Sequence, residues 1–383
     1  MNTYTFLQEY WYFLVALLGG LLVMLLFVQG ANSLIFCAGR TEEERSLIVN
    51  ATGRKWEFTF TTLVTFGGAF FAAFPLFYST SFGGAYWVWM LILVSFVLQA
   101  VSYEFQSKPG NVLGRGAYRR FLVLNGLLGP FLLGAAVATF FTGSAFSVSH
   151  ARMGAIDLPL PAISSWDNAW HGLDALFNPW NIVLGLAVMF LARVLGALYL
   201  LNCLDDDTLR PRLRRLMLVS SLAFLVCFVA FAAHLFTKAG FAVDAAGTVT
   251  LQPHKYFDNL LAMPVVAAVL LAGVVLVLVG IGLTLRRPAF ARGIWFAGAG
   301  TVLTVLSLFL LAGYNGTAYY PSVTDPQSSL TLANSCSSQF TLTAMAWVSL
   351  LIPFVLAYIA YAWRAIDRRS LTREELKEEE HKY

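Results

Sequence analysis

Residues 11–36 read WYFLVALLGGLLVMLLFVQGANSLIF, an apolar run that a polar stretch, QGANS at 29–33, interrupts near its end. A run of about 20 apolar residues is what a helix needs to cross the hydrocarbon core of a bilayer. Polar groups near a membrane are costly, and where they persist they usually bind an ion, a ligand or a partner. The run therefore predicts a transmembrane helix that ends in a candidate functional segment.

The whole chain has the composition of an integral membrane protein. Hydrophobic residues make up 58% of its 383 residues and charged residues 12%, about half the charged fraction of a soluble domain. The basic residues form short clusters beside apolar runs, and the net charge is only +4, so we predict no nucleic-acid partner. The first ten residues contain no Lys or Arg. We therefore expect no cleavable signal peptide, and the first helix stays in the protein.

Nine apolar runs long enough to cross a bilayer follow one another along the chain. None alternates apolar and polar residues, which excludes a membrane barrel. The runs cover 11–36, 57–80, 83–103, 120–143, 180–203, 214–236, 261–285, 292–314 and 339–363. We predict an all-α polytopic membrane protein with one membrane domain over 1–363, arranged as two four-helix bundles plus a peripheral helix, and a charged cytoplasmic tail over 364–383.

The basic residues predict the orientation of these spans. Of the 25 Lys and Arg residues, 21 lie in the tail or in loops after odd-numbered runs, and three lie on the opposite side. The positive-inside rule then places the N-terminus outside and the C-terminus in the cytoplasm. The remaining one, Arg193, lies inside the fifth run. It either snorkels toward the cytoplasmic face or pairs with a group on another segment.

Groups that bind metals or perform catalysis are sparse in the runs. Of five histidines, only His234 falls in a run, near its outer end, and the four cysteines form no CxxC pair. We predict no metal site and no catalytic residue, and His234 is expected to be interfacial or hydrogen-bonded. Thr41 and the three glutamates after it predict a capping box that opens a surface helix. Gly67 and Gly68 are interpreted as a site of close helix packing.

A series of short motifs then gives the chain a family resemblance. The motifs are the polar break at 29–33, GRTEEER at 39–45, Asn50, Trp56-Glu57, GGAFFAAFP at 67–75, YEFQSK at 103–108, SLTLA at 329–333, SS at 337–338 and TLTAM at 341–345. In this order they resemble subunit II of the cytochrome bd-type quinol oxidases. The resemblance covers essentially the whole chain, and the sharp motifs occupy 30–108 and 329–348.

The resemblance implies a haem-free subunit of the bacterial plasma (inner) membrane. Its partner would be subunit I, which carries haems b and d, takes electrons from the quinol pool and reduces oxygen to water, generating a proton gradient. Subunit II would stabilise that partner in a pseudosymmetric heterodimer and in some members hold a structural quinone. A small accessory single-span subunit is a further candidate partner. The residues assigned to family motifs are Trp56, Gly67, Gly68, Pro75 and Glu104.

The chain departs from the family pattern where protons and oxygen are concerned. Two acids typical of the first span are replaced by Gln29 and Asn32, and an amide cannot carry a transferable proton near neutral pH. Glu57 keeps the acid of a second motif, and Thr62 stands where the family places a tryptophan at a candidate oxygen entrance. The candidate proton path is thus Glu57, Gln29 and Asn32, and both routes are put in question.

Two other functions remain open from the residues alone. A secondary transporter usually has broken helices or charges near the midplane, and this chain offers mainly Arg193. A membrane scaffold protein is almost indistinguishable by sequence from a haem-free oxidase subunit. Co-elution with a haem-bearing partner would favour the oxidase, and a stable haem-free monomer that moves a solute would exclude it.

Overall fold

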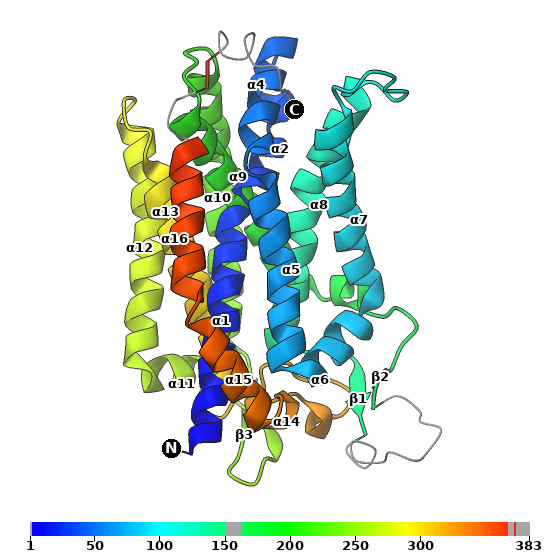
Figure 1. The fold of residues 1–383 in the computed structure, drawn as a ribbon. Coiled ribbons are helices and arrows are strands. Elements are labelled where there is room, and N and C mark those ends of the chain that lie inside the picture. The colour runs from blue at the N-terminus through cyan, green and yellow to red at the C-terminus, as the bar shows by residue number, and fades with distance from the viewer. Residues whose placement is uncertain (1, 150–162, 367–370, 373–383) are drawn as a thin grey trace.

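The computed structural model of the chain describes residues 2–149, 163–366 and 371–372. Within these ranges seven helices are long and apolar enough to cross a membrane, and two bent helix pairs raise the number to nine. They coincide with the nine predicted runs, so the prediction of an all-α polytopic membrane protein is confirmed. The long helices stand side by side, and α1 begins at the end opposite to where α16 finishes (Figure 1). An odd number of crossings requires this.

The first half of the chain forms one group of helices. Its elements are α1 (Thr3–Leu25), α2 (Phe27–Asn32), α3 (Ile35–Ala38), α4 (Glu42–Gly53), α5 (Trp56–Ala73), α6 (Pro75–Phe77), the π-helical turn η1 (Tyr78–Gly83), α7 (Tyr86–Phe105) and α8 (Arg115–Thr142). The predicted second span does not run straight. It bends by 119° between Ala73 and Pro75, because proline lacks the N–H that would continue the helix and instead begins a new one.

The second half forms the other group. Its long elements are α9 (Pro179–Cys203), α10 (Leu209–Thr237), α12 (Pro264–Arg286), α13 (Gly293–Gly313), α15 (Gln339–Ser349) and α16 (Ile352–Ile366). Helices α9 and α10 pack together, as do α12 and α13, while α8–α9 and α1–α13 contacts join the two groups. Helix α16 buries none of its described residues within the chain, as expected of a peripheral helix.

Short elements cover the predicted outer end. They are the antiparallel pairs β1 (Phe146–Val148) with β2 (Ser164–Trp166) and β3 (Gly240–Val243) with β4 (Val249–Gln252), and the helices η3 (Leu173–Phe177), α11 (Lys255–Ala262), η4 (Pro326–Ser328) and α14 (Leu332–Ser335). Beneath them lies an aromatic core that includes Tyr12, Phe77 and Tyr319, all buried. The charged tail predicted over 364–383 lies outside the described residues beyond Ile366, apart from 371–372.

Candidate functional site

The polar break in the first span is a separate short helix, α2, held between α8 and α9. A Cβ on Gly30 would stand 1.7 Å from the Ala192 carbonyl oxygen, and one on Gly126 would stand 2.5 Å from that of Gln29. Only glycine permits backbones to approach this closely. At the junction of α1 and α2, the Thr59 hydroxyl donates to the Leu25 carbonyl at 2.9 Å. Close backbone contacts therefore hold the break in a defined position in the fold.

The side chains of α2 pair with polar groups of α7. Gln29 Nε2 donates to Gln99 Oε1 at 2.9 Å, and the Tyr103 hydroxyl donates to Asn32 Oδ1 at 2.7 Å. Asn125 on α8 extends the group. All five side chains are buried, and their amide and phenol groups are neutral near pH 7. We use the name amide cluster for Gln29, Asn32, Gln99, Tyr103 and Asn125.

The amide cluster has unused hydrogen-bonding atoms of both kinds. Gln29 Oε1 and Asn125 Oδ1 are buried acceptors, and Asn32 Nδ2 and Gln99 Nε2 are buried donors, without partners in the described part of the chain. Such atoms are costly to bury unless something satisfies them. Water both donates and accepts, whereas a cation would satisfy only the oxygens and an anion only the N–H groups. The arrangement therefore suits internal water.

The structure separates Glu57 from the two amides of the candidate proton path. Trp56 points inward and stacks on Tyr103, with ring centroids 5.9 Å apart. Glu57, one residue on, is exposed on the outer surface of α5. Consecutive residues of a helix face directions about 100° apart, so an inward Trp56 turns Glu57 away from the amide cluster. Gln29 and Asn32 thus share one buried site, and Glu57 belongs to the surface.

Arg193 reaches the end of α2. Its Nη1 atom donates to the Ser33 hydroxyl at 2.8 Å and to the Ser33 carbonyl at 3.3 Å. Ser33 is the C-cap of α2, where unpaired carbonyls and the helix dipole favour a cation. The sequence left open whether Arg193 snorkels or pairs with another segment. In the described structure it pairs with another segment, through Ser33.

The other motif residues of α5 and α7 lie near or on the outer surface. Thr62 is half-buried and its hydroxyl donates to the Phe58 carbonyl at 2.7 Å. Within the described chain the glycine pair makes no close helix contact: a Cβ on Gly68 would meet nothing within 4 Å, and one on Gly67 would make only ordinary contact with Phe82. Glu104 is exposed and pairs with Lys108 at 3.3 Å.

Glu44 joins the predicted cytoplasmic loop to the second group of helices. Its carboxylate accepts from Arg212 at 2.8 Å and from the backbone N–H of Arg40 at 2.7 Å. These bonds, with that of Arg212 first, lower the pKa of Glu44 to about 2. The capping box with Thr41 is confirmed, but the expected surface helix is wrong, because α4 is buried from Leu47 to Gly53.

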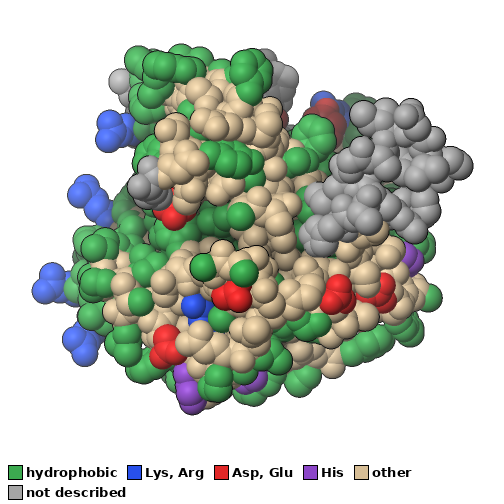
Figure 2. Space-filling view, turned by 90° about the horizontal axis from the view of Figure 1, so that it is seen from below, with side chains coloured by type: hydrophobic (Ala, Val, Ile, Leu, Met, Phe, Trp, Pro, Cys, Tyr) green, Lys and Arg blue, Asp and Glu red, His purple; other side chains and the backbone are tan. Residues whose placement is uncertain are grey.

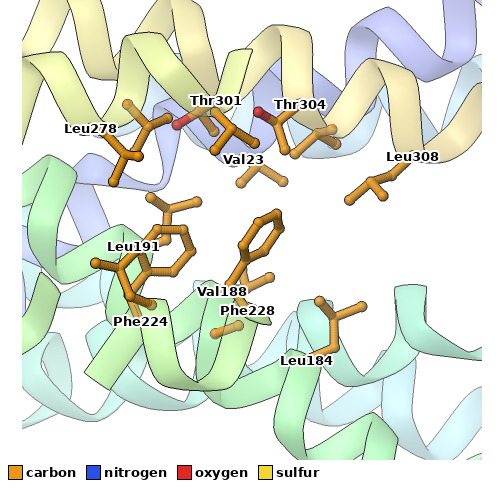
Figure 3. Close-up of a pocket in the computed structure, with 15 residues that line it drawn as sticks. Val23, Leu184, Val188, Leu191, Phe224, Phe228, Leu278, Thr301, Thr304 and Leu308 are labelled. Atoms are coloured by element: carbon orange, nitrogen blue, oxygen red, sulfur yellow. The ribbon is translucent and has the colours of Figure 1, made fainter. Parts of the chain in front are cut away.

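An apolar cavity of about 60 Å³ lies between α1, α9, α10, α12 and α13. Figure 3 shows Phe228, Leu278 and Val188 around it. Its Thr304 hydroxyl is buried without a partner in the described residues. An engineered cavity of about 150 Å³ is needed to hold one benzene ring. The cavity is thus smaller than one known to bind a benzene ring, and its lining is almost entirely apolar.

Histidines and other metal ligands do not gather in the described part of the chain. No group of three or more His, Cys, Asp or Glu side chains there could hold a metal ion. His234 instead lies flat against Trp180, with ring centroids 3.9 Å apart and planes 3° apart. Stacking on an aromatic ring at the outer end of a span is the behaviour expected of an interfacial histidine.

Sequence reasoning missed three members of the buried site and its surroundings, namely Ser95, Gln99 and Asn125. A signal was available, because Ser95, Gln99 and Tyr103 recur every four residues in α7 and so share one face of the helix. Asn125 Nδ2 donates to Ser95 Oγ at 3.0 Å and links that face to α8. Polar residues at helical spacing within an apolar run therefore predict an inward face.

Residues 7–366 match the family model described as "Cytochrome bd terminal oxidase subunit II". The chain is 28% identical to the cytochrome bd-I ubiquinol oxidase subunit 2 of Escherichia coli (strain K12), covering 100% of this chain and 99% of the relative. It is 25% identical to the cytochrome bd ubiquinol oxidase subunit 2 of Bacillus subtilis (strain 168), covering 95% and 96%. A chain of the bd oxidase from Geobacillus thermodenitrificans has the same fold, with a TM-score of 0.63 at 16% identity over 94% of this chain and 98% of that one.

Proposed function

Because the chain belongs to the cytochrome bd terminal oxidase subunit II family, we propose that it docks as a haem-free subunit on a haem-bearing subunit I through the exposed faces of α5 and α16. It is a multi-pass membrane protein of a bacterial respiratory oxidase. Its relatives are named as ubiquinol oxidase subunits, so the proposed reaction is quinol oxidation and oxygen reduction to water on subunit I, with generation of a proton gradient. The family argues against an independent transporter.

The surface of α5 carries the proposal. Its exposed positions include Glu57, Thr61, Thr65 and Gly68, which we call the polar face of α5. Polar and small side chains on a spanning helix usually meet protein rather than lipid. The exposed positions of α10 differ, since they are aliphatic from Leu218 to Val229 and suit lipid. One side of the molecule thus suits a protein partner and the other suits the bilayer.

Helix α16 extends the polar face of α5 with a row of aromatic side chains. Phe354, Tyr358 and Tyr361 are each at least 70% exposed. The end of α16 meets the start of α5, where the Trp363 ring lies 5.6 Å from that of Phe58. Aromatic residues supply large contact areas in protein interfaces. We therefore assign α16 to the same docking surface.

Within this subunit we assign different roles to the candidate proton-path residues. The amide cluster would hold water but no proton of its own, because amides do not titrate near neutral pH. Glu57 would exchange protons at the interface with subunit I, where its carboxylate is available to a partner. Thr62 stays a candidate oxygen entrance, although it is not among the residues that line the apolar cavity.

The test is co-purification of the whole oxidase in mild detergent with Gly68→Phe and, as the control, Val226→Phe. Both replace an exposed residue of a spanning helix by the same large side chain. Gly68→Phe is expected to reduce the haem that co-elutes with this subunit by at least about tenfold, and Val226→Phe to leave it unchanged. Equal haem content in the two variants would remove α5 from the docking surface, and wild-type subunit that elutes without haem would exclude the oxidase function.

A further inference from the structure

Five arginines gather where α10, α12 and α13 meet at the predicted cytoplasmic face; we call them the arginine corner. They are Arg214, Arg215, Arg286, Arg287 and Arg292. Arg214 Nη2 donates to the Pro288 carbonyl at 2.5 Å, which fixes the start of α10 against the loop that connects α12 to α13. The other four side chains are exposed. Three chain segments thus bring positive charge to one place.

Among the described residues, the arginine corner differs from the rest of this face in having no acidic partners. Elsewhere Arg119 pairs with Glu42, Arg210 with Asp205 and Arg212 with Glu44. Within residues 2–149, 163–366 and 371–372, no arginine of the corner forms an ion pair with a carboxylate. Seen from the predicted outer end, several basic side chains project beyond one edge of the molecule (Figure 2). The charge is therefore available to an external anion.

Aliphatic stripes lead from the arginine corner into the membrane region. Arg215 lies on the same exposed face of α10 as Leu218 and Leu222. In the same way, Arg286 shares an exposed face of α12 with Val279 and Val275. These spacings of three, four and seven residues define one side of a helix. Each stripe therefore ends in an arginine at the level of the lipid headgroups.

Residues of the same two helices line the apolar cavity. Phe224 and Phe228 of α10 line it, as does Leu278 of α12, whose side chain is also 42% exposed. From Arg215 to Phe224 the distance along the helix is roughly 14 Å, at 1.5 Å per residue. This is within the length of one acyl chain below a headgroup.

We propose that the arginine corner binds the phosphate headgroup of an anionic phospholipid, with an acyl chain running between α10 and α12 toward the apolar cavity. Arginine binds phosphate with two parallel N–H donors, and the cytoplasmic leaflet is anionic. The site combines unpaired guanidinium groups with an adjoining apolar groove. A free phosphate would contact only the guanidinium groups, and a neutral lipid would occupy only the apolar groove.

The test measures lipid binding to the intact, delipidated oxidase by native mass spectrometry. Phosphatidylglycerol and phosphatidylcholine with the same acyl chains are titrated separately. Removing both Arg286 and Arg287 as R286Q/R287Q is expected to weaken phosphatidylglycerol binding by about 25-fold, since each arginine contributes about 1 kcal/mol, or about fivefold. Phosphatidylcholine binding should not change.

Two matched variants separate this site from general surface charge. R115Q/R120Q removes two exposed arginines at the start of α8 and should leave phosphatidylglycerol binding within about twofold of the wild type. R286K/R287K keeps the charge but loses the two parallel N–H donors of each arginine, so its phosphatidylglycerol binding should fall between that of the wild type and that of R286Q/R287Q. The proposal is overturned if R115Q/R120Q is as damaging as R286Q/R287Q, or if both lipids bind equally to the wild type. It is equally overturned if millimolar inorganic phosphate displaces the lipid, because the site would then recognise free phosphate.

Discussion

Gly196 of α9 lies directly against Gly30 of α2, so close that a Cβ on Gly196 would stand 2.5 Å from the Gly30 carbonyl carbon. The two glycines allow the short α2 helix to sit at the centre of the molecule, where Gln29 and Asn32 meet α7. The position of the polar break at 29–33 therefore depends on two sets of contacts, the glycine contacts with α9 and the amide contacts with α7. The glycines set the separation of α2 and α9, and the amides of Gln29 and Asn32 bond to Gln99 and Tyr103 of α7.

Replacing Gly196 by alanine tests the glycine contact between α2 and α9. The added methyl group meets backbone atoms of Gly30 and Ala31 that cannot rotate away, so the helices must separate. Overpacking of a core usually costs about 1–3 kcal/mol, and a clash with backbone is expected at or above the top of that range. Thermal unfolding of the purified oxidase should show a clearly lower Tm for Gly196→Ala.

Gly282→Ala is the matched control, because a Cβ there would meet nothing within 4 Å. Alanine is the better helix former by about 1 kcal/mol, so this variant should be neutral or slightly more stable. Similar losses of Tm in the two variants would show that the separation of α2 and α9 is not set by glycine.

The sequence predicted the number and positions of the spans, because bilayer thickness fixes the length of an apolar run. It did not predict the turn at Pro75, since hydropathy records composition and not chain direction. The capping box at Thr41 predicted a helix but not its burial, which depends on contacts with α9 and α10 far away in the chain. Gln99 and Asn125 escaped notice for a similar reason. The spacing of Ser95, Gln99 and Tyr103 predicts a shared inward face on α7, but their partners on α2 and α8 follow only from the folded structure.

The bond from Tyr103 to Asn32 is open to a conservative test. Tyr103→Phe removes the hydroxyl and keeps the ring that stacks on Trp56. Hydrogen bonds between membrane helices contribute about 0.6 kcal/mol on average, so a small loss of Tm is expected. Asn32→Leu removes the partner, and the double variant should then be less destabilised than the sum of the singles. Strict additivity would contradict a direct interaction.

Glu44 gives the predicted cytoplasmic side a defined pH dependence. Its folded pKa of about 2 lies below the ordinary value of 4.5, so the folded protein favours the carboxylate. The stabilisation is fully present above about pH 4.5 and is lost as the pH falls toward 2. Glu44→Gln should cost about 2–4 kcal/mol at pH 7, because it removes the carboxylate that pairs with Arg212.

The difference in Tm between wild type and Glu44→Gln should therefore shrink as the pH is lowered from 6 to 3. Asp207→Asn is a suitable control, since the Asp207 side chain is fully exposed and lies 4.0 Å from Arg210. Exposed pairs contribute little, and this variant should follow the wild-type curve. A pH-independent difference for Glu44→Gln would mean that the carboxylate acts only by its shape.

Glu57 is the remaining acid of the family motif, and its test is kinetic. If its carboxylate passes protons to subunit I, Glu57→Gln should slow oxygen consumption by the whole oxidase by roughly tenfold or more, as loss of a positioned proton donor commonly does. Haem content should be unchanged, because glutamine keeps the size of the exposed Glu57 side chain and its ability to hydrogen-bond at the docking surface. Turnover is measured with excess quinol, so that proton delivery can limit the rate.

Glu104→Gln is the control for this effect. Glu104 is also an exposed acid near the predicted cytoplasmic end of a spanning helix, but its carboxylate is paired with Lys108. Its removal should leave turnover within about twofold of the wild type. Asn32→Asp adds a further test, because it restores an acid to the amide cluster without touching Glu57. Normal turnover in Glu57→Gln would mean that Glu57 acts only in docking. If Asn32→Asp also raises turnover, proton delivery is governed by the amide cluster and not by Glu57.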